Sequence, residues 1–366
     1  MVHFKNEEIL NDTPVVVLDF DILEQNIEWL NNLAEKSNIK LRPHVKTHKS
    51  TYIADLQIKA GATGITTATL GEAEVMVNSG IRDILIAYPI IGEKKLKRFG
   101  KLLKHADLTV ALDDIIVAKG LSEVGKANSK TIDIYIDIDT GNERMGRSPQ
   151  ESINEILEIA ALPFINIKGL TSHPGHAYAE SDVEKLKRIA IDDATELYKT
   201  KMLLEKENLH IPEISVGATA IARFTGEIPY VTEVRAGMYV FNDRNVMATG
   251  GATEDDCAVT IYSTVVSRPS KDRLIIDAGS KTLAHDPNIE GGFGRIKNQE
   301  NLVIKRLSEE HAIVEIQGKC DLRVGDIVEI IPNHICPVIN LTDEVYGFRG
   351  GVFEKTVTID ARGKNK

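Results

Sequence analysis

Residues 131–162 read TIDIYIDIDTGNERMGRSPQESINEILEIAAL and contain a strand, a loop and a helix in that order. The segment IDIYIDI at 132–138 is a short run rich in isoleucine, which predicts a β-strand. The segment PQESINEILEIAAL at 149–162 begins with proline and repeats its apolar residues at helical spacing, which predicts an amphipathic helix. Together they predict one βα unit, from which parallel sheets are built.

The same alternation extends in both directions from this unit. The strand candidates are 40–46, 63–67, 83–87, 107–111, 132–138, 165–171, 212–216 and 231–235, with amphipathic segments between them. Eight such strands within roughly 200 residues favour a closed (β/α)8 barrel of the TIM type, and a doubly wound open sheet is the alternative.

After residue 250 the pattern changes. Runs such as AVTIYSTVVSR, AIVEIQG and DIVEIIP alternate without intervening helical segments, which predicts a C-terminal all-β domain. The boundary is expected within 245–256, so the expected domains are a barrel at 1–250 and a β domain at 251–366. The early strand TPVVVLDF at 13–20 exceeds the barrel count, and residues 1–20 are therefore expected to join the second domain.

Composition and charge narrow the function. The 366 residues carry a net charge of −10 without a sustained basic stripe, which argues against a nucleic-acid partner. No apolar run approaches the roughly 18 to 20 residues that span a bilayer. The first residues, MVHFKNEEILNDTP, lack the apolar core of a signal peptide, and the three cysteines are too scattered for a disulfide framework. We therefore expect a cytoplasmic protein that binds a small molecule.

The stretch LRPHVKTHKS at 41–50 surrounds Lys46 with other basic groups. At the end of the first barrel strand, Lys46 would lie on the face where barrel enzymes place catalytic groups. Nearby positive charge, here from His44, His48, Arg42 and Lys49, and desolvation both favour the neutral amine, which is the nucleophile that forms a Schiff base with an aldehyde. A solvated basic edge is the alternative, and this stretch alone does not decide between them.

Two loops after the last predicted barrel strands provide an anion-binding pattern. They read SVGATAIARF at 215–224 and VRAGMYVFND at 234–243. Barrels often bind phosphate in these loops, where backbone N–H groups and hydroxyls meet a helix N-terminus. The candidate residues are Ser215, Gly217, Thr219, Gly237 and Tyr239. A lysine for a Schiff base and a phosphate site together suggest pyridoxal 5′-phosphate.

Arg144 follows the strand at 132–138 in the glycine-flanked loop DIDTGNERMGRSP. An arginine stays cationic and can only donate hydrogen bonds, so opposite the ring nitrogen of the cofactor it would keep that nitrogen unprotonated. An ordinary surface ion pair is the alternative for this residue.

The chain as a whole resembles the D-threonine aldolase and D-serine dehydratase family, whose barrel is of the alanine-racemase type, fold type III among pyridoxal-phosphate enzymes. The resemblance is carried by RPHVKTHK (42–49), TLGEAE (69–74), DTGNERMG (139–146), SVGATA (215–220), EVRAGMYVF (233–241), DAGSK (277–281), LSEEHA (307–312) and PNHICP (332–337). It implies that Lys46 is the Schiff-base lysine, that Arg144 faces the pyridine nitrogen and that the two loops bind the phosphate. It also implies a homodimer in which the β domain of one subunit closes the site of the other.

His334 and Cys336 lie two residues apart in IPNHICPVINL. In an extended segment both side chains would point the same way and reach one ion. An imidazole and a thiolate suit Zn²⁺ best, with Mn²⁺ as the harder alternative. Such a pair standing alone is more often incidental, but the family resemblance implies a divalent cation here. Family members that are D-serine dehydratases pair His with Cys, whereas aldolase members often pair His with Asp.

We therefore expect a metal-dependent pyridoxal-phosphate lyase that acts on D-β-hydroxy amino acids and yields a 2-oxo acid and ammonia, as a D-serine dehydratase does. The alternative is D-threonine aldolase-type cleavage to glycine and an aldehyde. An amino-acid racemase would need no metal pair, and a cofactor carrier without catalytic activity would lack the β domain, so both are less favoured.

Two further segments contain candidate residues. In TSHPGHAYAES (171–181), which also contains His173, His176 or Tyr178 is expected to face the substrate, unless the histidines are incidental to a turn. In DAGSKTLAHD (277–286), Lys281 and His285 have no assigned role. Cys257 and Cys320 have no partner at metal-binding spacing and are expected in the core.

Overall fold

The computed structural model describes residues 7–366, with side chains from residue 9 onward, so the first six residues of the expected N-terminal segment lie outside it. The chain divides into two compact units. The β unit contains the residues up to Glu28 together with Thr47–Tyr52 and Met238–Arg362. The barrel unit contains Trp29–Lys46, Ile53–Gly237 and Gly363–Lys366. Because the chain changes unit several times, neither is a single segment of the sequence.

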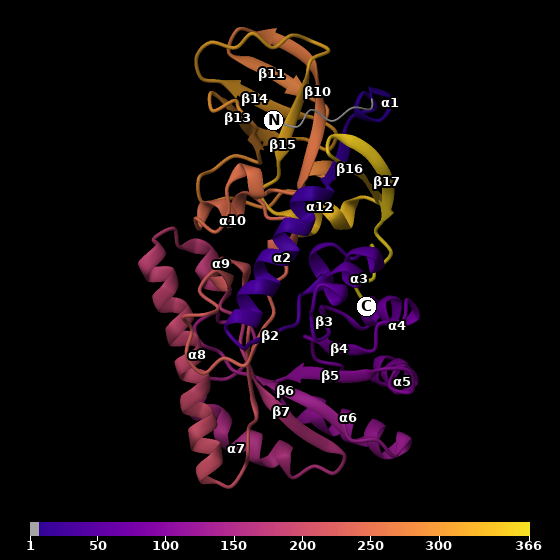
Figure 1. The fold of residues 1–366 in the computed structure, drawn as a ribbon, viewed down its shortest axis with the longest axis vertical. Helices are drawn as coiled ribbons and strands as arrows, with labels where there is room; N and C mark the ends of the chain where they lie inside the picture. Colours follow the sequence, from indigo (N-terminus) through magenta and orange to yellow (C-terminus); the bar gives the residue numbers. More distant parts are fainter. Residues whose placement is uncertain (1–6) are drawn as a thin grey trace. The chain divides into compact units, whose positions relative to one another are not determined.

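Eight parallel strands form the sheet of the barrel unit (Figure 1). They are β2 (Lys40–Leu41), β3 (Ile65–Thr67), β4 (Asp83–Ile86), β5 (Asp107–Leu112), β6 (Ile132–Asp137), β7 (Ile165–Thr171), β8 (Glu213–Val216) and β9 (Glu233–Val234). From β3 to β9 each strand pairs with the next, β9 pairs with β2, and a parallel bridge between His44 and Thr66 joins the β2 segment to β3. The ring is closed, and the predicted (β/α)8 barrel is confirmed.

Helices follow the strands as the alternation predicted. They are α3 (Thr51–Lys59), α4 (Leu70–Asn78), α5 (Glu93–Leu102), α6 (Ile115–Asn128), α7 (Pro149–Ala160), α8 (Val183–Lys206) and α9 (Thr219–Ala222), while α2 (Phe20–Lys36) begins in the β unit and ends in the barrel unit. Figure 1 shows α5 to α8 flanking strands β4 to β7. The first residue of α7 is a proline, which has no N–H and is tolerated where helical N–H groups lack partners anyway.

The first barrel strand is shorter than the sequence suggested. The prediction of a strand over 40–46 is wrong, because β2 ends at Leu41 and the residues Val45–Thr47 form a 3-10 turn. Pro43 has no backbone N–H for a strand ladder, which limits regular pairing at this point. Lys46 therefore lies in a turn at the carboxyl end of β2.

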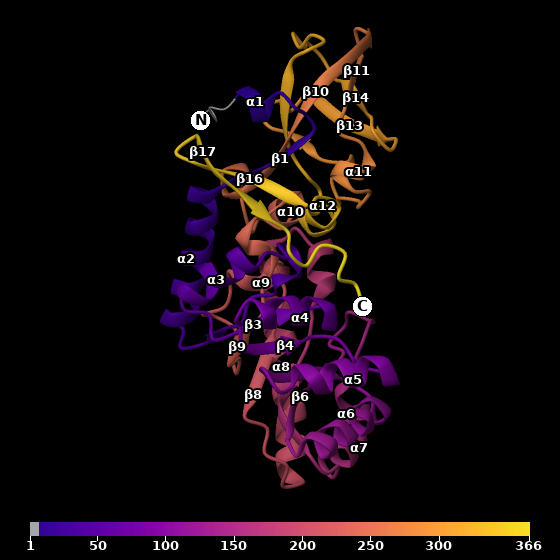
Figure 2. The same ribbon diagram turned by 90° about the vertical axis from the view of Figure 1, so that its right-hand side faces the viewer.

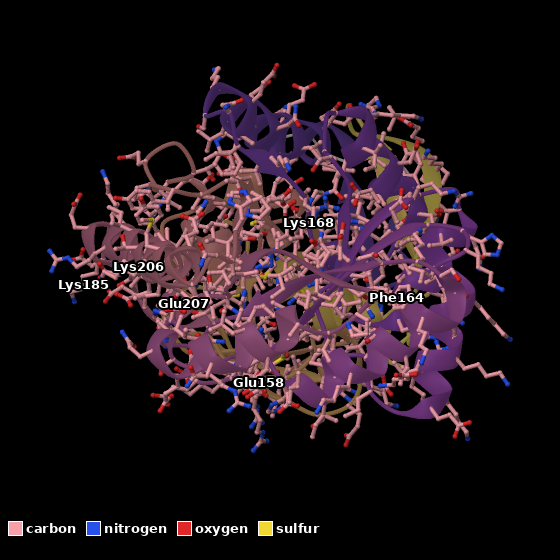
Figure 3. All side chains as sticks on the ribbon, turned by 90° about the horizontal axis from the view of Figure 1, so that it is seen from below. Glu158, Phe164, Lys168, Lys185, Lys206 and Glu207 are labelled. Carbon is pink, nitrogen blue, oxygen red and sulfur yellow. The ribbon has the colours of Figure 1, made fainter. Side chains whose placement is uncertain are left out.

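A polar cluster fills part of the barrel interior. The Nε of Arg42 donates to a Glu233 carboxylate oxygen at 2.7 Å, and both side chains are almost fully buried. The Ser215 hydroxyl also donates to Glu233, at 2.7 Å, while the Tyr135 hydroxyl donates to Glu213. Figure 3, a view from below, labels Lys168 of β7 nearer the middle of the picture than Phe164, which precedes that strand. The buried charges of Arg42 and Glu233 thus pair with each other, which offsets their desolvation.

The β unit is built on one nine-stranded sheet. Its strands are β1 (Val15–Asp19), β10 (Val259–Ser270), β11 (Arg273–Ile276), β12 (Arg295–Ile296), β13 (Leu302–Leu307), β14 (Ala312–Ile316), β15 (Ile327–Ile331), β16 (Glu344–Arg349) and β17 (Val352–Thr358). The order is β11-β14-β13-β12-β15-β10-β1-β16-β17, and an additional β10–β11 pairing closes six of these strands into a barrel. β1 lies between β10 and β16, as expected for the early strand (Figure 2).

The β unit also contains short helices that the sequence did not indicate. They are α1 (Glu7–Leu10), α10 (Arg244–Ala248), α11 (Ser280–Leu283) and α12 (Ile335–Leu341). The expected C-terminal β domain is confirmed, and its short helices were not predicted because runs of four to seven residues are too short to show a helical period. Among residues 7–366, no helix combines the length and apolar character that crossing a membrane requires.

Two of the quoted motifs build the β unit itself. Asp277 in DAGSK accepts hydrogen bonds from the hydroxyls of Thr13 and Ser263 and from the N–H of Thr264. A Cβ at Gly279 would clash with the backbone carbonyl of Glu309, so the motifs DAGSK and LSEEHA are in direct backbone contact. These contacts give both motifs a structural role.

We predict that Glu233→Gln lowers the free energy of unfolding by about 3 to 5 kcal/mol, because it leaves the buried guanidinium of Arg42 without a full counter-charge. The measurement is a urea titration followed by circular dichroism. The matched control is Asp55→Ala, which breaks the exposed pair with Lys59 and should cost about 0.5 kcal/mol or less. A similar small effect for both substitutions would contradict this account of the barrel interior.

Candidate active site

Lys46 is half-buried and is held from both sides by backbone pairing. The N–H of His44 donates to the carbonyl of Ala236 after β9, at 3.0 Å. The carbonyl of Pro43 accepts from the N–H of Thr66 in β3, at 2.8 Å. The lysine is therefore fixed at the carboxyl end of the barrel strands, the end that carries the chemistry in this fold.

Two neutral histidines lie close to Lys46. Burial lowers the pKa of His44 well below its ordinary value, and the positive charges of Lys46 and Arg235 lower it further. Burial likewise lowers the pKa of His173 to about 3, with Lys46 and Arg144 contributing. The Nδ1 of His173 lies 2.5 Å from the carbonyl oxygen of Gly217. The structure thus brings together Lys46, Arg144 and His173, which are far apart in the sequence.

The cationic neighbours predicted for Lys46 are only partly correct. Arg42 pairs with the buried carboxylate of Glu233 at 2.7 Å and with the partly exposed carboxylate of Asp83 at 2.6 Å. His48 belongs to the β unit, where its ring packs edge-on against Phe241. Lys49 is also grouped with the β unit. His173 and Arg235, by contrast, couple to the His44–Lys46 segment, and the sequence analysis gave neither of them this role.

The loop that carries Arg144 is tightly organised. One carboxylate oxygen of Asp139 accepts three backbone N–H groups, those of Gly141, Asn142 and Glu143, at 3.0 to 3.1 Å. Two side-chain contacts tie the loop to its surroundings: Thr140 donates to Asp193, and the N–H of Gly146 donates to Asp113. A loop whose backbone N–H groups are satisfied in this way holds Arg144 on a defined backbone.

Asp137, at the end of β6, is a site residue that sequence reasoning missed. Burial raises its pKa to about 7, against the opposing effect of Arg235; Asp113 raises it further and Arg144 lowers it. A carboxyl group with such a shifted pKa among arginines is typical of functional sites. Its place at the end of a barrel strand is a signal that the sequence analysis could have used.

The predicted phosphate loops are only partly available for an anion. The hydroxyl of Ser215 donates to Glu233 and accepts from the Nε of Arg235, at 2.7 and 2.9 Å, so it is committed to the barrel interior. The N–H of Thr219 donates to the hydroxyl of Tyr178 at 2.9 Å. The second loop is divided, with Gly237 in the barrel unit and Tyr239 buried in the β unit.

At Gly217 in the first of these loops, only glycine fits. A Cβ there would lie 2.9 Å from the Cβ of Arg235 and 3.1 Å from its carbonyl oxygen. Such distances are shorter than real Cβ contacts, so any side chain would force the two loops apart. The backbone of this loop is therefore close to a buried arginine.

His176 and Tyr178 lie in the 3-10 turn Gly175–Ala179 after β7. The Nδ1 of His176 is buried and makes no hydrogen bond within the described part of the chain, while its ring lies near Gly141 of the Arg144 loop. Tyr178 instead reaches the phosphate-type loop through Thr219. Of the two candidates, His176 has the ring nitrogen left for a ligand.

The His334–Cys336 pair does not lie in an extended segment, so that prediction is wrong. His334 is the N-cap of α12 and Cys336 is its second residue. The proline that follows, Pro337, is in the first helical turn, where no intrahelical N–H is needed. The strand β15 ends at Ile331 and α12 begins at Ile335. The alternation of apolar residues did not indicate that a helix follows the strand so soon.

The pair is coupled electrostatically. Burial opposes a charge on His334, but Cys336 and Asp243 together raise the pKa of the imidazole to about 11. The hydroxyl of Thr47 lies 3.3 Å from the Sγ of Cys336. Among the described residues there is no group of three or more His, Cys, Asp or Glu side chains that could hold a metal ion. His334 and Cys336 therefore remain a candidate pair of ligands.

Both parts of the chain match known families. Residues 18–245 match the alanine racemase N-terminal domain, and residues 258–348 match the putative serine dehydratase domain. D-threonine aldolase from Arthrobacter sp is 30% identical over 96% of this chain and 93% of its own. D-threo-3-hydroxyaspartate dehydratase from Delftia sp. (strain HT23) is 28% identical over 89% of this chain and 91% of its own.

Solved structures agree with these matches. D-threonine aldolase from Filomicrobium marinum has a TM-score of 0.90 at 29% identity and covers 97% of both chains. A D-threo-3-hydroxyaspartate dehydratase lacking one histidine has a TM-score of 0.90 at 27% identity over 96% of both chains. A variant lacking a cysteine two positions further on, described as the metal-free form, has a TM-score of 0.89 at 27% identity over 96% and 98%.

The barrel and the β unit together define an alanine racemase-like fold. The chain belongs to the alanine racemase N-terminal domain family and continues into a serine dehydratase-type domain. The resemblance inferred from the sequence motifs is thereby confirmed.

The low pKa of His173 predicts a pH effect on stability. Its imidazole binds a proton near pH 6.5 in the unfolded chain but only near pH 3 in the folded one, so the unfolded state gains protons as the pH falls. Relative to His173→Gln, the wild type should lose stability below pH 6.5 by no more than about 1.4 kcal/mol per pH unit. Urea titrations at pH 7 and pH 5 measure this difference, and a difference independent of pH would contradict it.

Proposed function

We propose that this protein is a pyridoxal-phosphate- and metal-dependent lyase acting on D-β-hydroxy amino acids, and that it dehydrates a D-serine-type substrate to a 2-oxo acid and ammonia. The observation that carries the proposal is Lys46, half-buried at the carboxyl end of β2 between histidines whose pKa values are lowered. The similar enzymes are named as lyases on D-amino acids, which agrees with the enzyme class expected from the sequence.

The residues present fit the cofactor. Lys46 would hold its aldehyde carbon, and Arg144, on its well-ordered loop, would face the ring nitrogen. The phosphate would be held by the loops of Gly217, Thr219, Gly237 and Tyr239, with Ser215 supporting Arg235 beneath them. When bound, pyridoxal phosphate supplies an electron sink that weakens the bonds at the α-carbon of an amino acid.

The removal of the substrate α-proton is assigned to Lys46, and two further groups are proposed to surround it. Lys46 Nζ takes the proton from the substrate α-carbon, since a neutral amine at this position is an effective base. His173, held neutral by burial and nearby cations, adds no positive charge of its own next to Lys46. His176, with its buried and unpartnered Nδ1, is proposed to face the substrate, with Tyr178 as the second candidate.

The metal is proposed to bind at His334 and Cys336, with substrate or water completing its coordination. An imidazole and a thiolate favour Zn²⁺ over Mn²⁺. A cation there would bind the substrate β-hydroxyl and improve it as a leaving group. The support is the similar dehydratase, in which a histidine and a cysteine were replaced at the same two-residue spacing and the cysteine variant is described as metal-free.

Retro-aldol cleavage to glycine and an aldehyde is the second candidate. The 30% identity to D-threonine aldolase from Arthrobacter sp favours it. In that reaction the proton lost is that of the substrate hydroxyl, and the Cα–Cβ bond breaks. The Cys at position 336 is why we rank dehydration first, since the sequence resemblance associates His with Cys in dehydratases. An amino-acid racemase remains the least favoured, because it would not use the metal pair.

The family resemblance also leads us to propose a homodimer located in the cytoplasm. The acidic net charge of −10 fits a small-molecule substrate rather than a nucleic-acid partner. Sedimentation of the purified protein, with a mass near twice 40.4 kDa as the expected result, tests the assembly.

The decisive test is a product assay. The loaded enzyme is incubated separately with D-serine, D-threonine and D-3-hydroxyaspartate, and 2-oxo acid, ammonia and glycine are measured. We expect 2-oxo acid and ammonia in equal amounts with little glycine. Glycine as the dominant product would reject dehydration in favour of the aldolase reaction, and the L-enantiomers serve as the control for stereochemistry.

Removal of the metal should test His334 and Cys336 separately from Lys46. Exhaustive chelation is expected to reduce turnover by at least about 100-fold, because leaving-group activation is lost, while the visible absorption of the bound cofactor stays unchanged. Added Zn²⁺ should restore activity. Turnover that survives chelation at the original rate would refute the proposed role of His334 and Cys336.

A further inference from the structure

Asp243 is a fully buried carboxylate directly before α10. Its Oδ1 accepts the N–H of Val246 at 2.9 Å and so caps that helix. Its Oδ2 accepts the N–H of Ile335 at 2.9 Å and lies 3.3 Å from the Nδ1 of His334. The two oxygens therefore serve two different helices.

The only ion-pair partner of Asp243 among the described residues is His334. The neighbouring Arg244 directs its guanidinium elsewhere, to the carbonyl of Gly291 and the side chains of Asn333 and Glu290. A buried carboxylate is costly unless it is paired and hydrogen-bonded. The carboxylate of Asp243 is thus paired with the imidazole of His334, two residues before Cys336.

Helix capping alone does not account for the second oxygen. Asp182, the N-cap of α8, accepts both of its capping hydrogen bonds, from Glu184 and Lys185, through one oxygen. Asn and Ser cap helices about as well as Asp does, so a capping role needs no carboxylate. Asp243 uses its additional oxygen on the backbone and ring at the start of α12.

The backbone around His334 is fixed from the same direction. The N–H of Arg244 donates to the carbonyl of Pro332, and the N–H of Asn245 donates to the carbonyl of Asn333, both at 3.1 Å. With Ile335 bound to Asp243, the residues on both sides of His334 are attached to the beginning of α10. With the backbone fixed, the orientation of the imidazole ring is what the contact between Oδ2 and Nδ1 restricts.

We propose that Asp243 is a positioning residue for the metal pair. Its Oδ2 contacts both the His334 ring and the first N–H of the helix that carries Cys336. A carboxylate oxygen next to Nδ1 favours a proton on that nitrogen and so leaves Nε2 to bind an ion, and carboxylates commonly orient metal-binding histidines in this way. The inference rests on the proposed metal site and deepens it, because it explains why the ligand pair begins a helix.

The experiment measures Zn²⁺ binding to the purified full-length protein, after metal removal, by competition with a chromophoric chelator. Asp243→Asn keeps the cap and the size of the side chain but removes the charge. It is expected to weaken Zn²⁺ binding by about 10- to 100-fold. Asp182→Asn, the matched control, changes a capping carboxylate in the barrel unit and should bind Zn²⁺ as the wild type does.

A second readout reports the geometry of the ligands. The visible and near-ultraviolet spectrum of the Co²⁺-substituted protein is expected to change in Asp243→Asn and to be unchanged in Asp182→Asn. If Asp243→Asn does not yield folded protein, Asp243→Ser retains a capping hydroxyl and is expected to weaken Zn²⁺ binding to the same degree. A purely structural role would lower stability without altering the Co²⁺ spectrum or the affinity.

His334→Ala separates failure of this inference from failure of the proposed function. If His334→Ala abolishes Zn²⁺ binding while Asp243→Asn binds Zn²⁺ with wild-type affinity and spectrum, the positioning role is overturned and the metal site stands. If wild type and His334→Ala bind Zn²⁺ equally, the metal site itself is overturned, and the role of Asp243 with it.

Discussion

Closure of the barrel across the short strand β2 determines where the chemistry can occur. The segment around Pro43 pairs with β9 through His44 and Ala236 and with β3 through Thr66, so it cannot shift along the sheet without breaking both sets of hydrogen bonds. The 3-10 turn that follows places Lys46 at the carboxyl end of the strands. Because one residue of register reverses side-chain direction in a strand, this pairing also fixes which way the segment points.

The buried polar cluster connects this closure to the site. Arg42 contacts Glu233, Glu233 accepts from Ser215, and Ser215 accepts from Arg235, whose other nitrogen donates to the carbonyl of Ser172 at 2.6 Å. The path runs from the barrel interior to the loop that carries the site histidines. A site built on such a fully bonded network is rigid before any ligand arrives, which reduces the entropy lost on binding.

Sequence reasoning predicted the parts of this protein whose signal is local. The strand and helix around residues 131–162 stand almost where periodicity placed them, and β1 joins the second sheet as its surplus to the barrel count indicated. The short length of β2 was missed because tertiary pairing and Pro43, not local propensity, end the strand. The start of α12 was missed because the helix is too short to show a period. Asp243 and Asp137 were missed because their roles depend on contacts across the fold, with His334 and with the arginines, that no spacing in the sequence shows.

The central claim is that Lys46, among the many lysines of this chain, bonds the cofactor. It is tested most directly by adding borohydride to the pyridoxal-phosphate-loaded protein, digesting it and locating the pyridoxyl group by mass spectrometry. The account predicts a single modified residue, Lys46, at one group per chain, with the label lost in Lys46→Arg. Label at Lys49 or Lys281 instead, or its absence from a loaded protein, would contradict it.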